Sequence, residues 1–363
     1  MAAPATVRYL WGMNDARLTL SVLDLIPVQS NQTSSQALAA TLALAQRAES
    51  LGYHRFWVAE HHNMAAVAST NPPLLMALIG ARTSRIRIGS GGVMLPNHSP
   101  LVIAEQAALL EAAFPGRVDL GLGRAPGSDP VITALLRSSG AVSDPDAFES
   151  NLQDIAALLS TKGAALRLRS GQTYEVRATP HADSEPRMWV LGSSDFSARL
   201  AARRGLPYVF AHHFAGDQAS TARALSLYRN DFTPSEGLAS PEVFIGVNVS
   251  VAATREEARA RALPQLQLMA RLRSGLPLGP VATVEEAAAT QLGHTQLEMI
   301  DEMAARWIID TPDAAARRLR ALARDFGLAE LMVVPYGADR AGDDPTAAAS
   351  RIETLELLAE AMA

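Results

Sequence analysis

The sequence predicts an α/β protein in which eight parallel strands and their helices close into a (β/α)8 TIM barrel. Short runs rich in Val, Ile and aromatic residues alternate with amphipathic Ala/Leu-rich stretches, a rhythm typical of parallel strands joined by helical crossovers. Eight such strand runs are present, which is the number that closes this barrel. The 363 residues also exceed the ~250 of a typical barrel, which leaves room for insertions.

The elements follow in order along the chain. Ser34, Pro72 and Pro100 favour helix starts, because serine caps free backbone N–H groups and proline fits the first turn. Gly52 and the turn at 115–116 favour helix ends. The strands are expected at residues 18–23, 55–59, 86–90, 117–122, 188–191, 207–211, 243–249 and 331–334. The helices are expected at about 35–51, 72–82, 100–114, 194–204, 217–232 and 344–362.

Two connections are longer than normal, at about 125–186 after strand four and about 262–310 after strand seven. Insertions of this length in a compact domain often form lids or substrate loops. Because no low-complexity linker interrupts the rhythm, we expect one domain over 17–363, preceded by an N-terminal extension at 1–16. The rival fold is an open doubly wound sheet, but the turn after the first strand, 24–27, lacks dinucleotide-binding glycines.

The composition narrows the chemistry. The formal charge of −5 argues against a nucleic-acid partner, which needs a basic face. No stretch approaches the ~18 apolar residues of a membrane span, so we expect a cytoplasmic protein. Cysteine is absent and Lys162 is the one lysine, which excludes thiolate chemistry and a Walker-type phosphate loop. Catalysis must therefore use His, carboxylates, hydroxyls, Arg or a bound cofactor.

Polar residues after strands four and five predict an anion site. Gly192, Ser193 and Ser194 end the fifth strand and open a helix, with Ser197 three residues on. Free N–H groups and the helix dipole there favour an anion, and Arg124, after strand four, could bind the same phosphate. The alternatives are ordinary N-capping for the serines and a rim salt bridge for Arg124; Arg124 shifts the balance toward the anion site.

An imidazole follows the second strand, in the run Glu60, His61, His62. Alternation along the chain directs one of these histidines into the barrel mouth, where it could exchange a proton near neutral pH. A structural histidine pair is the alternative. A metal site would need further ligands, such as His98 or the pair at 212–213, and no His-x-His pattern supports it; no metal is therefore expected.

Gly91 and Gly92 follow the third strand, which implies backbone that comes close to another group. A flat aromatic ligand against this backbone would explain the missing side chains. The glycine pair, the predicted anion site after strands four and five, and the imidazole together suggest a flavin mononucleotide across the barrel mouth.

Long runs of this sequence resemble one known family. The runs are 51–64, 89–100 and 115–127, followed by 191–194 and 207–214. They are similar to the bacterial luciferase-like, flavin-dependent monooxygenases, and most of all to the single-chain luciferase-like oxidoreductases. The resemblance implies a barrel that binds FMN, supplied reduced by a separate NAD(P)H:flavin reductase. It also implies reaction with O₂ through a C4a-peroxyflavin and oxygenation of a small, apolar organic substrate, such as a natural-product intermediate.

The resemblance also implies roles for individual residues. His61 matches the catalytic imidazole, and the Gly91–Gly92 pair matches a cis peptide that lies against the flavin ring. The phosphate would be bound by Arg124 together with the strand-five turn, namely Gly192, Ser193, Ser194 and Ser197. A homodimer would form through the helices at about 72–82 and 100–113. Gly123 stands where luciferase has a reactive cysteine, so light emission is not expected.

Three other functions fit parts of the pattern. An F420- or FMN-dependent dehydrogenase on the same barrel would move hydride without consuming O₂. A non-catalytic flavin-binding protein would hold oxidised flavin without turnover. A metal-dependent hydrolase would contain Zn²⁺ and lose activity with a chelator. The substrate itself cannot be deduced from the sequence, because the segments that would contact it are the least family-like parts of the chain.

Overall fold

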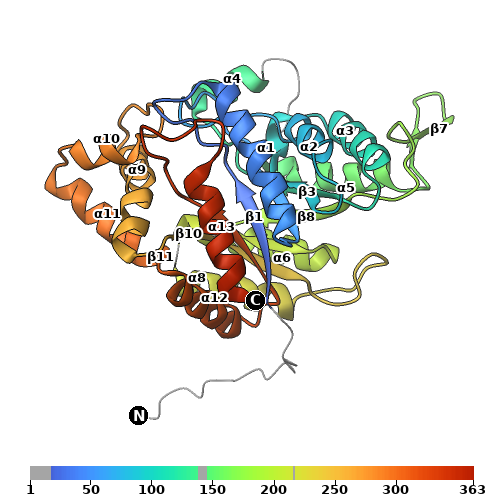
Figure 1. Ribbon diagram of the computed structural model, residues 1–363. Helices are drawn as coiled ribbons and strands as arrows, with labels where there is room; N and C mark the ends of the chain where they lie inside the picture. The colour runs from blue at the N-terminus through green and yellow to red at the C-terminus, as the bar shows by residue number, and fades with distance from the viewer. Residues whose placement is uncertain (1–17, 138–144, 216) are drawn as a thin grey trace, which may run out of the picture.

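The protein folds as the predicted closed barrel, with helices around it (Figure 1). The computed structural model describes residues 18–137, 145–215 and 217–363; the expected extension at 1–16 lies outside them. The barrel strands are β1 (Thr19–Asp24), β2 (Arg55–Val58), β3 (Arg87–Ser90), β5 (Val118–Gly123), β8 (Arg187–Gly192), β9 (Tyr208–Phe210), β10 (Val243–Val251) and β12 (Glu330–Pro335). Neighbouring strands pair in parallel, and the pairings of β9 with β10 and of β12 with β1 complete the ring.

Six helices lie close to their expected positions. They are α1 (Ser34–Ser50), α2 (Pro72–Gly80), α3 (Pro100–Ala113), α6 (Asp195–Arg204), α8 (Gln218–Asn230) and α13 (Ala349–Met362). The N-cap of α1 is Thr33, which forms a capping box with Gln36. Helix α13 begins five residues later than expected. Asp344 accepts a hydrogen bond from the Thr346 backbone N–H, and this local turn competes with helix formation.

The long connection after β5 contains one regular barrel helix and two additions. Helix α5 (Phe148–Leu159) packs beside α3 and belongs to the barrel layer. The additions are α4 (Pro130–Arg137) and an antiparallel hairpin of β6 (Ala164–Arg167) and β7 (Thr173–Val176), which projects from the body (Figure 1). A two-residue strand, β4 (Val93–Met94), and the 3₁₀ turn η1 (Leu95–Asn97) follow β3; a second 3₁₀ turn, η2 (Pro145–Ala147), precedes α5.

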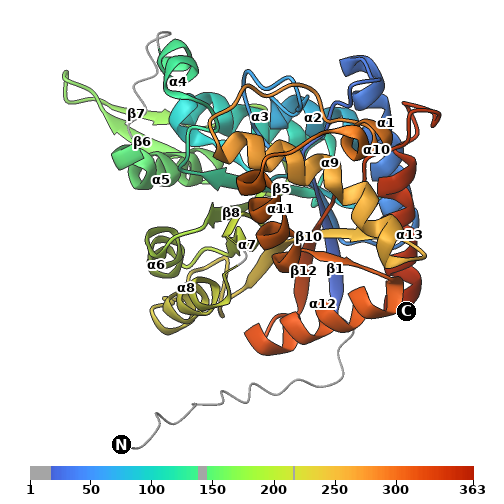
Figure 2. The same cartoon turned by 90° about the vertical axis from the view of Figure 1, so that its left-hand side faces the viewer.

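The connection after β10 forms a helical unit with its own core. Its elements are α9 (Arg255–Arg273), α10 (Val284–Ala289), α11 (His294–Arg306), β11 (Ile308–Asp310) and α12 (Pro312–Phe326). Figure 2 shows α9, α10 and α11 together on one side of the barrel, where α9 and α11 bury Leu266, Ile300 and Met303 between them. Strand β11 pairs with the end of β10 that reaches past β9. None of the helices in the described ranges combines the length and apolar character that a membrane crossing requires.

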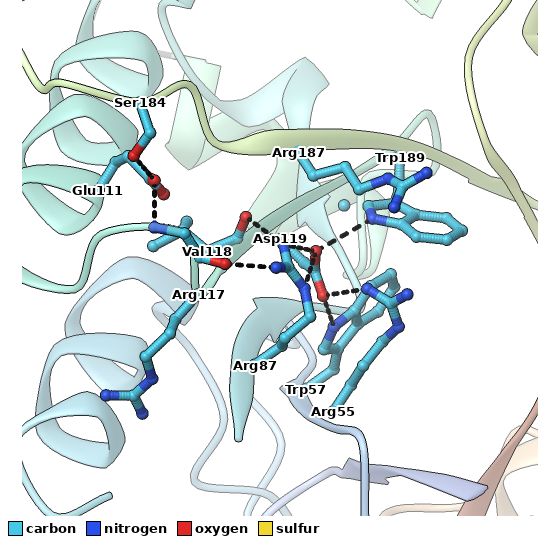
Figure 3. Close-up of polar contacts among 12 residues, drawn as sticks. Arg55, Trp57, Arg87, Glu111, Arg117, Val118, Asp119, Ser184, Arg187 and Trp189 are labelled. Atoms are coloured by element: carbon cyan, nitrogen blue, oxygen red, sulfur yellow. Dashed lines mark hydrogen bonds and ion pairs between the residues drawn. The ribbon is translucent and has the colours of Figure 1, made fainter. Parts of the chain in front are cut away.

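An ionic cluster fills the N-terminal end of the barrel (Figure 3). The fully buried Asp119 carboxylate accepts hydrogen bonds from Arg55 Nη1 at 2.7 Å and Arg87 Nη2 at 2.6 Å. Trp57 Nε1 and Trp189 Nε1 also donate to it, at 3.1 and 3.3 Å. Burial alone would raise the pKa of Asp119, but the two guanidinium groups hold it below its usual value. The barrel is thus closed at this end by paired charges and indole rings.

Candidate active site

A cavity of about 410 Å³ opens at the C-terminal ends of the barrel strands. This is the end at which (β/α)8 barrels carry their sites. Its floor is apolar and includes Leu23, Trp57, Leu191, Val209 and Met332. Every site residue predicted from the sequence lies in its wall, namely His61, Gly91, Gly92, Arg124, Gly192, Ser193, Ser194 and Ser197. The fold therefore brings the predicted residues into one space.

The Gly91–Gly92 peptide forms a wall of bare backbone and is cis, as the resemblance implied. A Cβ at Gly91 would lie 2.7 Å from Leu23 Cδ1, and one at Gly92 would lie 2.9 Å from the Gly121 carbonyl oxygen. Neither position has room for a side chain. A flat ligand can therefore approach the backbone here directly.

The N-terminus of α6 borders the cavity. Ser194 is its N-cap residue, but its side chain makes no capping hydrogen bond. The Ser193 and Ser194 side chains are exposed to the cavity. Ser197 is different, because it is buried and its hydroxyl donates to the Ser194 carbonyl oxygen at 2.8 Å. The capping that could have explained these serines is absent, so Ser193 and Ser194 keep their hydroxyls available to an anion.

Arg124 follows β5 and lies beside this helix terminus. Its guanidinium carbon lies 4.3 Å from the centre of the Phe196 ring, a cation–π geometry. The expected alternative was a rim salt bridge, yet within the described residues no carboxylate pairs with Arg124. An unpaired cation at a helix N-terminus is suited to a phosphate group.

His61 supplies an imidazole to the cavity, while its neighbour His62 turns away from it. Burial lowers the pKa of His61 below its usual value, although the Gly127 carbonyl and Glu60 oppose the shift. The ring is therefore neutral near pH 7. His62 Nε2 instead lies 2.8 Å from Glu60 Oε1. The alternation expected from the sequence thus places His61 in the barrel mouth.

Glu60 joins two strand-end loops beneath His61, a role that the sequence analysis missed. Its fully buried carboxylate lies 2.9 Å from His98 Nε2 and accepts hydrogen bonds from the Met94 N–H at 2.9 Å and Asn97 Nδ2 at 3.2 Å. Burial alone would raise the pKa of Glu60, but hydrogen bonds from His62, His98 and Met94 lower it to about 2. The available signal was a carboxylate directly before the histidine run.

Two of the three additional histidines considered as metal ligands are directed elsewhere. His98 contacts Glu60, and His212 Nδ1 lies 2.8 Å from Thr221 Oγ1. His213, in the short helix α7 (His212–Ala215), does line the cavity and is a site residue that the sequence did not single out. In the part of the chain that the structure describes, no three His, Asp or Glu side chains are grouped to hold a metal ion.

An apolar cavity lined by an imidazole and an arginine at the strand ends is typical of a (β/α)8-barrel enzyme. Comparison with known proteins names the family. The sequence profile of the luciferase-like monooxygenases matches residues 18–330. The chain is 42% identical to the luciferase-like monooxygenase of Escherichia coli K12 over 263 residues, 72% of this chain and 75% of that one. The chain belongs to the luciferase-like monooxygenase family, and the enzyme class expected from the sequence, a flavin-dependent monooxygenase, is confirmed.

Two further relatives cover nearly the whole chain. The N-acetyl-S-alkylcysteine monooxygenase of Bacillus subtilis strain 168 is 31% identical over 322 residues, 87% of this chain and 92% of that one. The crystal structure of apo-MsnO8 is 33% identical, with a TM-score of 0.81 over 96% of this chain and 98% of that one. This likeness also confirms the predicted barrel.

Two distant structures share the fold alone. One is the oxygenating constituent of 3,6-diketocamphane monooxygenase from Pseudomonas putida in complex with FMN, at 17% identity and a TM-score of 0.66 over 95% of this chain and 98% of that one. The other is an F420-dependent secondary alcohol dehydrogenase, at 16% identity and a TM-score of 0.62 over 94% of this chain and 99% of that one. The fold therefore carries more than one cofactor.

Proposed function

We propose that the protein is an FMN-dependent monooxygenase that receives reduced FMN from a separate NAD(P)H:flavin reductase. It would use O₂ to oxygenate a small, mostly apolar organic molecule. One observation carries this proposal. An arginine and a helix N-terminus with two serines, which have no side-chain partner among the described residues, meet a wall of bare backbone in one apolar cavity. The FMN bound by the diketocamphane enzyme on the same fold supports this choice of cofactor.

The phosphate end of FMN would lie at the rim. Arg124 would pair with the phosphate, and the Ser193 and Ser194 hydroxyls and the α6 N-terminus would donate hydrogen bonds to it. The isoalloxazine ring would then lie against the Gly91–Gly92 backbone, where no Cβ obstructs it. Ser197 would act by holding the turn rather than by touching the phosphate, since its hydroxyl already donates to Ser194.

Bound reduced FMN supplies the reaction with O₂ that the side chains of this chain cannot perform. The residues contribute the surroundings. Leu23, Trp57 and Met332 line the cavity with apolar surface that excludes water from the reacting groups. The neutral His61 ring can hold or transfer one proton beside the flavin.

The substrate class follows from the same lining. The cavity is largely apolar and would be shared with the cofactor, so the second molecule would be small and mostly apolar. The N-acetyl-S-alkylcysteine monooxygenase among the relatives is named for a substrate that joins an apolar alkyl part to a polar N-acetylcysteine part, so only the alkyl part matches this class.

The assembly is proposed to be a homodimer through α2 and α3. Five apolar side chains on these two helices are exposed, with exposed fractions up to 65% at Leu74 and 59% at Leu109; the others are Leu78, Leu101 and Val102. An apolar surface of this kind on two adjacent helices is typical of a helix–helix interface.

The His61→Ala variant tests the proposed chemistry. The affinity for FMN should stay within about twofold of that of the unchanged protein, because the proposed phosphate contacts at Arg124, Ser193 and Ser194 are intact. Product formation should fall about 10²–10⁴-fold, as expected when a positioned proton carrier is removed. The assay would couple a flavin reductase and NADH to the protein, with a panel of aldehydes, ketones and thioethers, and would follow O₂ uptake, H₂O₂ release and product.

Two results would contradict the proposal. Normal turnover by His61→Ala would show that this imidazole is not needed for catalysis. Oxidation of an alcohol with FMN or F420 as hydride acceptor, without O₂ uptake, would instead favour the dehydrogenase, which the F420-dependent structure of the same fold represents.

A further inference from the structure

His213 contributes a second imidazole to the cavity wall, apart from His61. It lies in α7, directly after β9. A Cβ built on Gly246 of β10 would lie only 2.3 Å from His213 Nδ1, so the ring occupies the space where a strand side chain would otherwise enter the barrel. The Phe214 ring packs beside it, with centres 4.3 Å apart. Gly246 therefore makes room for this imidazole.

Among the residues that the structure describes, the ring of His213 has no hydrogen-bond partner. Nδ1 is buried and unpaired, and no residue in the described ranges bonds to Nε2. By contrast, His62 and His98 contact Glu60, and His212 contacts Thr221. Leaving a buried polar atom unpaired costs about 1–3 kcal/mol, and such atoms in native proteins need an explanation.

The backbone around His213 is nevertheless held in place. Asn248 Nδ2 donates to the His213 carbonyl oxygen at 2.8 Å. The ring is thus fixed by this bond, by Phe214 and by the contact with Gly246. A fixed ring without a partner indicates a preformed contact point for a ligand rather than a loosely placed side chain.

The charge state of His213 restricts that ligand. Burial and the charges of His212 and His61 lower the pKa of His213 to about 3, so the ring is neutral and offers one N–H donor and one lone pair. A neutral ring suits an uncharged oxygen and gives no advantage to an anion. The phosphate contacts lie elsewhere, at Arg124 and the α6 N-terminus, and the glycine wall follows β3.

We propose that His213 is a specificity-determining residue that hydrogen-bonds a carbonyl or hydroxyl oxygen of the organic substrate. This rests on the proposed function, because it takes the cavity to hold FMN and a second organic molecule. The surrounding wall is apolar, at Val209, Phe214 and Met332. The substrate is therefore a mostly apolar molecule with one uncharged oxygen on the β9–β10 side, and a plain hydrocarbon is excluded from tight binding.

Matched pairs of probes test this inference with the FMN-loaded protein. The ketones 2-heptanone, 2-decanone and cyclooctanone would each be compared with the alkene in which CH₂ replaces the oxygen. Binding would be followed by calorimetry and by the change in the absorbance of the bound flavin. In the unchanged protein at least one ketone should bind about tenfold more tightly than its alkene, as one buried hydrogen bond predicts.

Two variants separate the hydrogen bond from the shape of the wall. His213→Phe keeps a ring beside Phe214 but has no polar atom, and its preference for ketone over alkene should fall to within twofold. His213→Gln places an amide near the position of Nε2, the ring nitrogen that is not buried, and should keep part of the preference. His294→Phe is the control, since it makes the same change at an exposed histidine of α11 outside the cavity and should leave the ratio unchanged. The far-UV circular dichroism spectrum and the melting temperature show that each variant is folded.

Three outcomes would overturn the proposal. The first is equal binding of every ketone and its alkene to the unchanged protein, which includes the case in which neither binds. The second is a full ketone preference in His213→Phe. The third is a fivefold or greater loss of FMN affinity in His213→Phe with an unchanged ketone ratio, which would place the ring against the flavin. Failure of FMN to bind the unchanged protein would instead contradict the proposed function, so the two failures are distinguishable.

Discussion

The two ends of the barrel contain similar residue types in opposite states. At the N-terminal end, Arg55 contacts Asp119 at 2.7 Å and Glu330 at 2.9 Å, and Glu242 lies 3.7 Å from it, so its charge is satisfied by three carboxylates. At the C-terminal end, Arg124 lies on the Phe196 ring and has no carboxylate partner in the described ranges. The two arginines differ in whether a carboxylate pairs with them. The paired arginine stabilises the fold, and the arginine without a carboxylate partner is available to bind a ligand.

Trp57 joins the two ends. Its indole N–H donates to Asp119 at 3.1 Å, while its ring lines the cavity floor. A Cβ at Gly91 would lie 3.3 Å from that ring. The paired cluster therefore fixes the surface on which the unpaired site is built, so damage to either end should be measurable separately.

The largest expected effect is a loss of stability when the buried ion pairs at the N-terminal end of the barrel are removed. Asp119→Asn removes the charge that Arg55 and Arg87 share, and breaking a buried ion pair of this kind costs about 3–5 kcal/mol. Urea denaturation should show a loss of this size in the free energy of unfolding. Glu356→Gln is the control, because its exposed pair with Arg47 should contribute less than about 1 kcal/mol. Equal stability of the two variants would contradict the comparison.

The cavity end also contains a paired carboxylate, Glu60, whose contribution to stability should depend on pH. The pKa of the Glu60 carboxyl is about 2 in the folded protein, below its ordinary value of 4.5, because His62, His98 and the Met94 N–H hydrogen-bond the ionised form. The contribution of ionised Glu60 to the free energy of unfolding is therefore complete above pH 4.5 and is lost as the pH falls toward 2. This contribution amounts to about 3 kcal/mol. Unfolding free energies between pH 6 and 3 should fall less steeply in Glu60→Gln than in the unchanged protein.

The exposed Glu298→Gln variant provides the control for that series. Glu298 pairs with His294 on the surface, so its removal should leave the pH dependence unchanged. If Glu60→Gln showed the same slope as Glu298→Gln, the bonds that join the two loops would not stabilise the ionised carboxylate.

The smallest effect concerns the ring under Arg124. Phe196→Leu removes the aromatic face but keeps the apolar volume, so Arg124 should be less ordered before phosphate binds. An exposed cation–π contact contributes about 0.5–1 kcal/mol, so FMN affinity should fall about two- to fivefold. Phe196→Tyr retains the ring and should bind FMN as the unchanged protein does. A loss shared by both variants would show that the ring itself is not responsible.

Much of the fold could be predicted because its signals are local. The β-rich runs and the Ser, Pro and Gly signals placed the barrel strands within about two residues of their observed ends. Since parallel strands end on one side of a barrel, the residues after each strand could be assigned to one site. Arg124 and Ser193, far apart in the sequence, line the same cavity for this reason.

The remainder depends on contacts between distant residues. Arg55 and Asp119 are 64 positions apart and lie in strands that the sequence marks only as β-rich. Strand β11 forms because β10 extends past β9 and leaves an edge free, which local propensity does not reveal. The sequence also shows His212 and His213 as equivalent neighbours, and only the geometry of α7 decides which one faces the cavity.

The central claim is that the unpaired end of the barrel holds the phosphate of FMN. Anaerobic titration of the protein with reduced FMN and with reduced riboflavin, which lacks the phosphate, tests this claim most directly. FMN should bind about 10- to 100-fold more tightly, as hydrogen bonds to a charged group predict, and Arg124→Leu should remove most of that difference while riboflavin binding is unchanged. Equal binding of the two flavins, or a full FMN preference in Arg124→Leu, would contradict the account.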